Sequence, residues 1–109
     1  MAEVDAESGS RALVERIGDE DGSPVIRVTG ELDLSNVDEM RRVLDPIVAE
    51  TPSRLIFELS ELQFMDSSAI TVFLQAAARV ARIELRNAGG PVRRIVEATG
   101  LTDILHLDP

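Results

Sequence analysis

The chain has 109 residues, of which 44% are hydrophobic, and a formal net charge of −9. This length predicts one domain with one hydrophobic core. Aromatic residues make up only 3% and neither tryptophan nor tyrosine occurs, so stacking surfaces for single-stranded nucleic acid are lacking. Because the negative charge also repels a phosphate backbone, nucleic-acid binding is disfavoured.

The chain contains no cysteine, which excludes disulfides and thiolate metal sites. Its apolar runs fall well short of the roughly 20 residues that a membrane helix needs, so we expect no membrane insertion. Residues 1–10 are acidic and lack the apolar centre of a signal peptide. We expect them to form a mobile acidic arm on a soluble, cytoplasmic protein.

The domain is predicted to begin with a hairpin. Residues 11–17 alternate weakly between apolar and polar, and residues 24–29 are rich in β-branched side chains. Between them, residues 18–23 are of the types that reverse a chain.

After a connection over residues 30–35, an amphipathic helix is predicted. Asn36 is its expected N-cap, with Glu39 as the capping-box partner. Pro46 removes a backbone hydrogen bond, so we expect a kink or a restart there. The helical spacing predicts one buried stripe, made of Val37, Met40, Leu44, Ile47 and Val48.

Residues 54–59 are apolar and predict a central strand. The stretch over residues 62–70 then runs from the end of a strand directly into a helix, with Asp66, Ser67 and Ser68 between them. Ser68 is the expected N-cap of that helix. Its predicted core stripe contains Ile70, Phe73, Leu74, Ala77 and Val80.

Residues 82–86 alternate and predict a strand, and residues 91–99 predict a helix that Gly100 closes. A short helical turn is expected over residues 101–107. The resulting order, β-β-α-β-α-β-α with a tail, predicts a largely parallel sheet with an antiparallel edge.

The sequence offers little catalytic chemistry. His106 is the only histidine, and neither a G-x-S-x-G nor a glycine-rich phosphate loop is present. Asp33 and Asp66 both lie in loops at the sheet edge, where a hydrolase or a divalent cation site would need them to converge. Two solvated loop acids are the preferred interpretation, so we assign no catalytic residue, metal or cofactor and expect no enzyme.

Ser67 is the candidate functional residue. The helix behind it offers unpaired N–H groups and a positive dipole end, an environment that tolerates a phosphate. Further along that helix, Val72 and Ala76 fall outside the predicted core arc, and we expect them to be exposed beside the serine.

Three motifs can be compared with a known family. They are Gly30-Glu31-Leu32-Asp33 with Asn36 three residues on, Phe64-Met65-Asp66-Ser67-Ser68, and Val92-Arg93-Arg94-Ile95 through Thr99-Gly100-Leu101. Together, from about residue 10 to the end, they resemble the STAS domain of bacterial anti-sigma factor antagonists. The resemblance implies an α/β, STAS-like single domain over residues 11–109. Its mostly parallel mixed sheet would carry an N-terminal antiparallel hairpin, with helices packed mainly on one face.

The resemblance also implies a mechanism. A partner anti-sigma factor, a serine kinase with a histidine-kinase-like ATP-binding fold, holds a sigma factor inactive until the unphosphorylated antagonist binds it. The partner phosphorylates the serine that matches Ser67, the phosphorylated form dissociates, and a protein phosphatase restores it. The expected partner-binding residues are Asp33, Asp66, Ser68, Val72 and Ala76.

Two features depart from the family pattern. Ala69 stands where the family usually has glycine, and its methyl group is expected to crowd an approaching kinase loop. The segment between the helix that starts at Ser68 and the strand at Ile83 is also short. The alternative function is that of a STAS scaffold or accessory subunit, without phosphorylation, in a stress-signalling or transporter complex. The third possible function is that of a hydrolase that uses Asp33 and Asp66.

Overall fold

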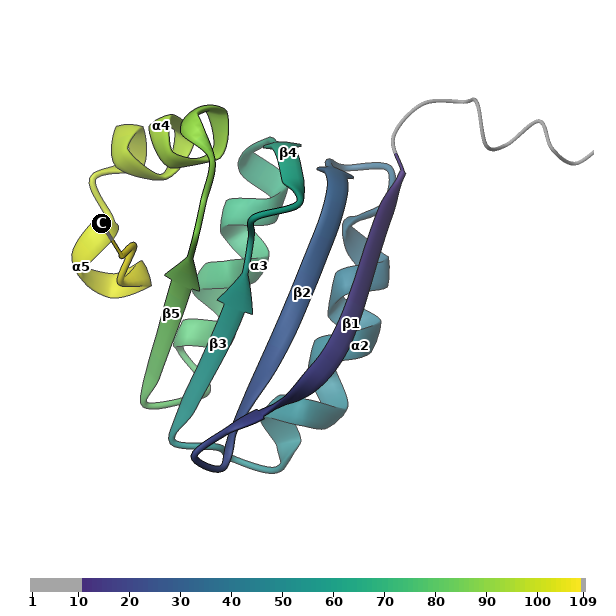
Figure 1. The fold of residues 1–109 in the computed structure, drawn as a ribbon, viewed down its shortest axis with the longest axis vertical. Helices are drawn as coiled ribbons and strands as arrows, with labels where there is room; N and C mark the ends of the chain where they lie inside the picture. Colours follow the sequence, from purple (N-terminus) through teal and green to yellow (C-terminus); the bar gives the residue numbers. More distant parts are fainter. Residues whose placement is uncertain (1–10, 109) are drawn as a thin grey trace, which may run out of the picture.

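The computed structural model describes residues 11–108, so the expected mobile arm at residues 1–10 lies outside the described residues. The elements follow in the order β1 (Ala12–Glu20), β2 (Ser23–Leu32), α2 (Val37–Ala49), β3 (Arg54–Glu58), β4 (Leu62–Met65), α3 (Ser67–Ala77), β5 (Arg82–Arg86), α4 (Gly90–Thr99) and α5 (Thr102–Leu105) (Figure 1).

The predicted mixed sheet is confirmed. Its strands run in the order β1-β2-β3-β5, with the β1–β2 hairpin antiparallel and the other pairs parallel. A fifth strand, β4, adds to the four expected from the sequence. The first part of β2 pairs with β3 and its last part with β4. The strand that leads to Ser67 therefore lies beside the end of β2.

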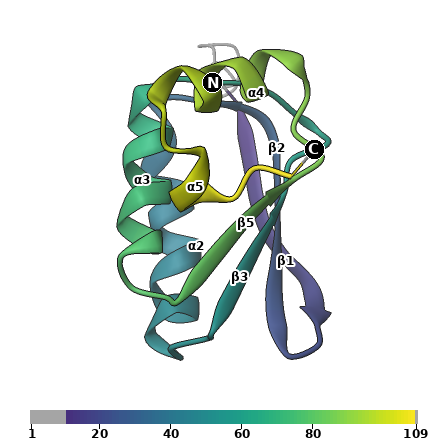
Figure 2. The ribbon, with the colours of Figure 1, turned by 90° about the vertical axis from the view of Figure 1, so that its left-hand side faces the viewer.

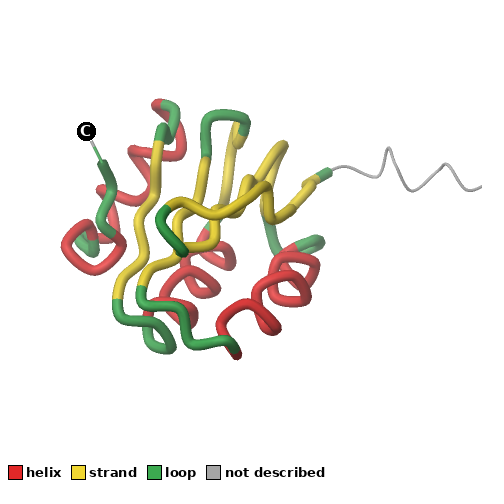
Figure 3. Tube along the Cα trace, turned by 60° about the horizontal axis from the view of Figure 1, so that its bottom comes forward, coloured by secondary structure: helices red, strands yellow, loops and turns green. Residues whose placement is uncertain are grey.

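The helices lie mainly on one side of the sheet, as predicted. Figures 2 and 3 show α2 and α3 against the same face. The core fills this interface, and within it the rings of Phe57 on β3 and Phe73 on α3 meet edge to face with centroids 4.9 Å apart. Such aromatic pairs add to the free energy gained by burial alone, so this contact helps to hold α3 on the sheet.

The opposite face of the sheet carries a network of ion pairs. The carboxylate of Glu84 on β5 lies 3.0 Å from a guanidinium nitrogen of Arg86 and 3.3 Å from one of Arg54 on β3. Arg86 also donates to both carboxylate oxygens of Glu20, at 2.7 and 2.9 Å. These contacts tie the end of β1 to β3 and β5 across the open face.

Helix α2 matches its predicted buried stripe, since all five stripe residues are buried. The predicted capping box is wrong. Asn36 precedes the helix but makes no side-chain cap hydrogen bond, and Glu39 pairs with Arg42 at 2.6 Å. The expected restart at Pro46 is also absent, because α2 continues through it. Pro46 is exposed, where water can reach the carbonyl oxygen that its missing N–H leaves unpaired.

The later elements follow the sequence pattern closely. The strand predicted over residues 82–86 is β5, and Gly100 closes α4 in the left-handed conformation with φ of 74°. That conformation is open to glycine at little steric cost. The N-cap of α3 is Asp66 and not Ser68, so this helix begins two residues earlier than predicted.

Candidate functional site

The site forms where two neighbouring strands end. Leu32 at the end of β2 pairs with Met65 at the end of β4, and the N–H of Asp66 donates to the carbonyl oxygen of Leu32 at 3.1 Å. Asp33 and Asp66 each follow directly after these paired residues. Parallel pairing therefore brings the two loop acids to the same edge of the sheet, which the separation of 33 positions in the sequence does not reveal.

Asp66 caps helix α3 through its side chain. One carboxylate oxygen, Oδ1, accepts from the backbone N–H of Ser68 at 2.9 Å and also from the hydroxyl of Ser68. The backbone of Asp66 is extended, with φ of −112° and ψ of −171°, as is usual for an N-cap. The carboxylate thus satisfies one unpaired donor at the helix start and complements the positive end of the helix dipole.

The two serines differ in what their hydroxyl groups do. The hydroxyl of Ser68 is held by Asp66, and its side chain is half-buried. Ser67 is exposed, and within residues 11–108 its hydroxyl has no hydrogen-bond partner. Its carbonyl oxygen accepts from the hydroxyl of Thr71 at 3.2 Å, inside the helix. The backbone of Ser67 is therefore fixed while its hydroxyl faces solvent.

The loop that carries Asp33 is held by its own side chains. Asp33 accepts from the N–H and the hydroxyl of Ser35 at 2.9 and 2.7 Å. The amide of Asn36 accepts from the N–H of Asp33 and donates to the carbonyl oxygen of Glu31. This local network replaces the predicted capping box and fixes the position of the half-buried Asp33 beside the strand end.

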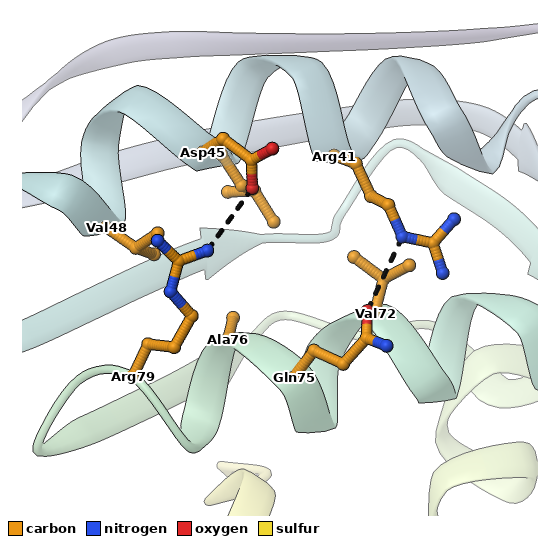
Figure 4. A pocket seen from close by; sticks show the side chains of 8 residues that line it. Arg41, Asp45, Val48, Val72, Gln75, Ala76 and Arg79 are labelled. Carbon is orange, nitrogen blue, oxygen red and sulfur yellow. Dashed lines mark hydrogen bonds and ion pairs between the residues drawn. The ribbon is translucent and has the colours of Figure 1, made fainter.

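The expected exposure of Val72 and Ala76 is wrong. They are 3% and 5% exposed and lie between α3 and α2. Figure 4 shows them beneath two polar bridges, in which Arg79 pairs with Asp45 at 3.3 Å and Arg41 donates to Gln75 at 3.4 Å. The predicted core arc was too narrow because α2 packs against α3 on a face that the pattern of α3 alone leaves open.

Ala69 is also fully buried. Its methyl group therefore packs into the core, and the expected clash with a kinase loop has no geometric basis. The side chain that replaces the usual glycine therefore adds nothing to the surface around Ser67.

The sequence did not indicate that two apolar side chains near the site are exposed. Leu34, directly after Asp33, is 77% exposed, and Phe64, two residues before Asp66, is 44% exposed. Leu62 and Met65, the first and last residues of β4, are buried. The sequence of β4 is apolar at three of its four positions, so it gives no signal of which side chain points outward.

The described part of the chain holds no cluster of three or more histidine, aspartate or glutamate side chains suited to a metal ion. His106 is half-buried in the segment after α5, and its carbonyl oxygen accepts from the N–H of Leu85. Across the same residues, every helix is too short or too polar to cross a membrane.

Comparison with protein-family models matches residues 11–109 to the STAS domain. The anti-sigma-B factor antagonist of Staphylococcus aureus (strain NCTC 8325 / PS 47) is 25% identical over 87 residues, covering 76% of this chain and 81% of that protein. A solved anti-sigma factor antagonist from Mycobacterium paratuberculosis has a TM-score of 0.75 at 26% identity, covering 93% of this chain and 86% of the other. The anti-sigma factor antagonist SpoIIAA in its unphosphorylated form gives 0.72 at 25% identity, covering 91% and 89%. Because the family match spans all the described elements, the chain belongs to the STAS domain family.

Proposed function

We propose that this protein is an anti-sigma factor antagonist. Its unphosphorylated form binds an anti-sigma serine kinase and releases a sigma factor, and phosphorylation of Ser67 ends the interaction. A protein phosphatase then restores the binding form. The single observation that carries the proposal is the exposed Ser67 hydroxyl at the start of α3. The neighbouring hydroxyl of Ser68 is instead hydrogen-bonded to the carboxylate of Asp66.

The geometry supports a phosphate on Ser67. The positive end of a helix dipole favours an anion, while the N–H groups of Ser68 and Ala69 already donate to Asp66. Helix α3 has 11 residues, so this dipole end is well developed. The hydroxyl is exposed, so the larger phosphoserine displaces no core residue and the fold is expected to persist.

The surrounding charge supports a switch in binding. Phosphorylation adds about −1.5 to −2 charges at neutral pH. These charges join Asp33 and Asp66 at one edge of the sheet. A partner surface that accepts the hydroxyl and two carboxylates meets a larger anion with different hydrogen-bonding needs, so binding is lost without a change of fold.

The relatives support the same role. The three reported above carry the description of anti-sigma factor antagonist, and one of them, SpoIIAA, is described in an unphosphorylated form. The alternative of a STAS scaffold requires a binding function that does not respond to phosphate at this serine.

The test uses the anti-sigma factor kinases of the source organism, purified one at a time and incubated with the chain, ATP and Mg²⁺. We expect one of them to add one phosphate to the wild type and none to Ser67→Ala. The phosphorylated chain should bind this kinase at least tenfold more weakly than the unmodified chain, and Ser67→Glu should be weakened in the same direction.

Ser60→Ala is the matched control, because Ser60 is an exposed serine in the turn between β3 and β4 and outside α3. It should be phosphorylated and bound as the wild type is. Equal affinity of the phosphorylated and unmodified chains would favour the scaffold function and contradict the switch.

A further inference from the structure

Leu34 and Phe64 stand out among the exposed side chains. Five large hydrophobic residues of the described chain have more than two fifths of their surface exposed: Leu13, Ile17, Leu34, Phe64 and Ile104. Two of them belong to the segments that carry Asp33 and Asp66. Single exposed apolar residues are ordinary on a protein surface, but these two flank the site of the proposed switch.

Their placement follows from strand pairing. Phe64 on β4 lies opposite Glu31 on β2, and one position further the strands pair Leu32 with Met65. On β4 the side chain of Met65 is buried and that of Phe64 is exposed. Leu34 follows two residues after Leu32, in the loop that the Asp33 and Asn36 hydrogen bonds hold. Phe64 thus projects from a paired strand, and Leu34 from a loop held by hydrogen bonds.

The residues around this pair are mainly acidic. The two segments that build the site, residues 28–40 and 55–78, contain no arginine or lysine. Their acidic residues are Glu31, Asp33, Asp38, Glu39, Glu58, Glu61 and Asp66. Arg41 and Arg42 form ion pairs with Asp38 and Glu39, and the other five carry the negative charge of these segments. Two exposed apolar side chains on mainly acidic segments call for a partner that offers apolar contacts with basic side chains around them. A second copy of this chain would bring the same acidic groups together, so it is a poor occupant.

We infer that Leu34 and Phe64 are the apolar anchors by which this chain docks on its anti-sigma factor. The matching surface is an apolar patch bordered by arginine or lysine side chains. The identity of the partner rests on the proposed function above, while the anchors and the chemistry of their counterpart come from exposure and charge. A few residues at the centre of an interface typically supply most of its affinity, while the polar surround sets orientation and rate of association.

The experiment measures the dissociation constant of the unphosphorylated chain for the anti-sigma factor kinase that modifies Ser67. Leu34→Ser and Phe64→Ser are compared with Ile17→Ser and Ile104→Ser. Ile17 is 44% exposed on β1, as Phe64 is on β4, and Ile104 is 49% exposed on α5. We expect each anchor variant to bind at least tenfold more weakly and each control to stay within threefold of the wild type. Wild-type binding should also weaken as salt is raised.

The outcomes separate the two proposals. If the wild type binds and Ser67→Glu releases, but both anchor variants bind like the wild type, the anchors are wrong and the switch stands. If no anti-sigma factor kinase binds the wild type, both proposals are overturned. Thermal melting checks the fold of each variant. Should Phe64→Ser unfold, Leu34→Ser alone decides, because a side chain 77% exposed in a loop contributes little to the core.

Discussion

Ser68 donates both its backbone N–H and its hydroxyl to the same carboxylate oxygen of Asp66. This double contact gives adjacent serines opposite chemical character at the start of α3. One hydroxyl closes the helix cap, and the other, on Ser67, is left exposed to solvent. A kinase must reach a free hydroxyl to transfer a phosphoryl group, so under the proposed function the cap favours Ser67 over Ser68 as the acceptor.

The first prediction concerns this selection. In the wild type, phosphate should be found on Ser67 and not on Ser68, as read by fragmentation mass spectrometry after incubation with the kinase and ATP. Ser68→Ala should still accept one phosphate, although its rate falls if loss of the hydroxyl contact loosens the helix start. Phosphate on Ser68 of the wild type would show that the hydrogen bond to Asp66 does not protect it.

The cap should also contribute to stability. Asp66→Ala leaves the N–H of Ser68 without its acceptor, and loss of such a cap costs about 1 kcal/mol. Asp66→Asn keeps an oxygen in place and should cost less. Urea unfolding of both variants measures this difference. Equal loss in the two would mean that the charge of Asp66, and not its hydrogen bond, stabilises α3.

The sequence predicted the fold well because its signals were local. The hairpin rests on turn residues, the stripe of α2 on a clean helical period, and the end of α4 on Gly100, and all three are present. The start of α3 was less certain because Asp66, Ser67 and Ser68 are all good N-cap residues. Only the backbone geometry decides which one is the cap.

The site was harder to predict because burial depends on partners distant in sequence. Val72 looks peripheral on the period of its own helix, yet α2 covers it. Phe64 looks like a core residue by composition, yet its strand turns it outward. The convergence of Asp33 with Asp66 required knowing that β4, and not β3, lies beside the end of β2.

The ion-pair network on the open face predicts loss of stability in acid. Hydrogen bonds from Arg86 hold the pKa of Glu20 below its ordinary value. Partial burial of Glu84 opposes its ionisation, but hydrogen bonds from Arg82 and Arg86 outweigh it, so its pKa is lowered as well. A carboxyl group whose pKa is lower in the folded than in the unfolded state stabilises the fold at pH values above the ordinary glutamate pKa. This stabilisation is lost as the pH falls below that pKa.

Urea unfolding between pH 7 and pH 3 checks this dependence. The wild type should lose stability as pH falls below about 4.5, the ordinary glutamate pKa, and Glu20→Gln with Glu84→Gln should flatten that part of the curve. Glu61→Gln, at an exposed glutamate outside the network, is the control and should keep the wild-type slope. If the double variant kept the wild-type dependence of unfolding free energy on pH, the ion-pair network would not be the cause of the acid destabilisation.

Gly30 should be intolerant of any side chain. Its φ is +93°, and a Cβ atom there would overlap the carbonyl oxygen of Arg11. Gly30→Ala should therefore lose about 2 kcal/mol or more of unfolding free energy, from strain and overlap together. Gly22→Ala is the control, because Gly22 also has positive φ, +81°, but open space around it. Gly22→Ala should lose only the free energy of backbone strain. Equal losses in the two variants would mean that β1 moves away from Gly30 at no cost in stability.

The last prediction separates packing from recognition at Val72. Because this side chain is 3% exposed between α3 and α2, Val72→Ala should lower the unfolding free energy by about 1–3 kcal/mol through lost burial and an incompletely filled cavity. Gln75→Ala, at an exposed position on the rim of the same groove, should change stability by less than about 0.5 kcal/mol.

Binding to the anti-sigma factor kinase is then measured at a temperature where both variants are folded. If Val72 acts only in packing, Val72→Ala should bind within threefold of the wild type. A tenfold or larger loss of affinity in the folded Val72→Ala protein, with Gln75→Ala unaffected, would instead mean that the partner opens the α2–α3 groove and contacts Val72 directly.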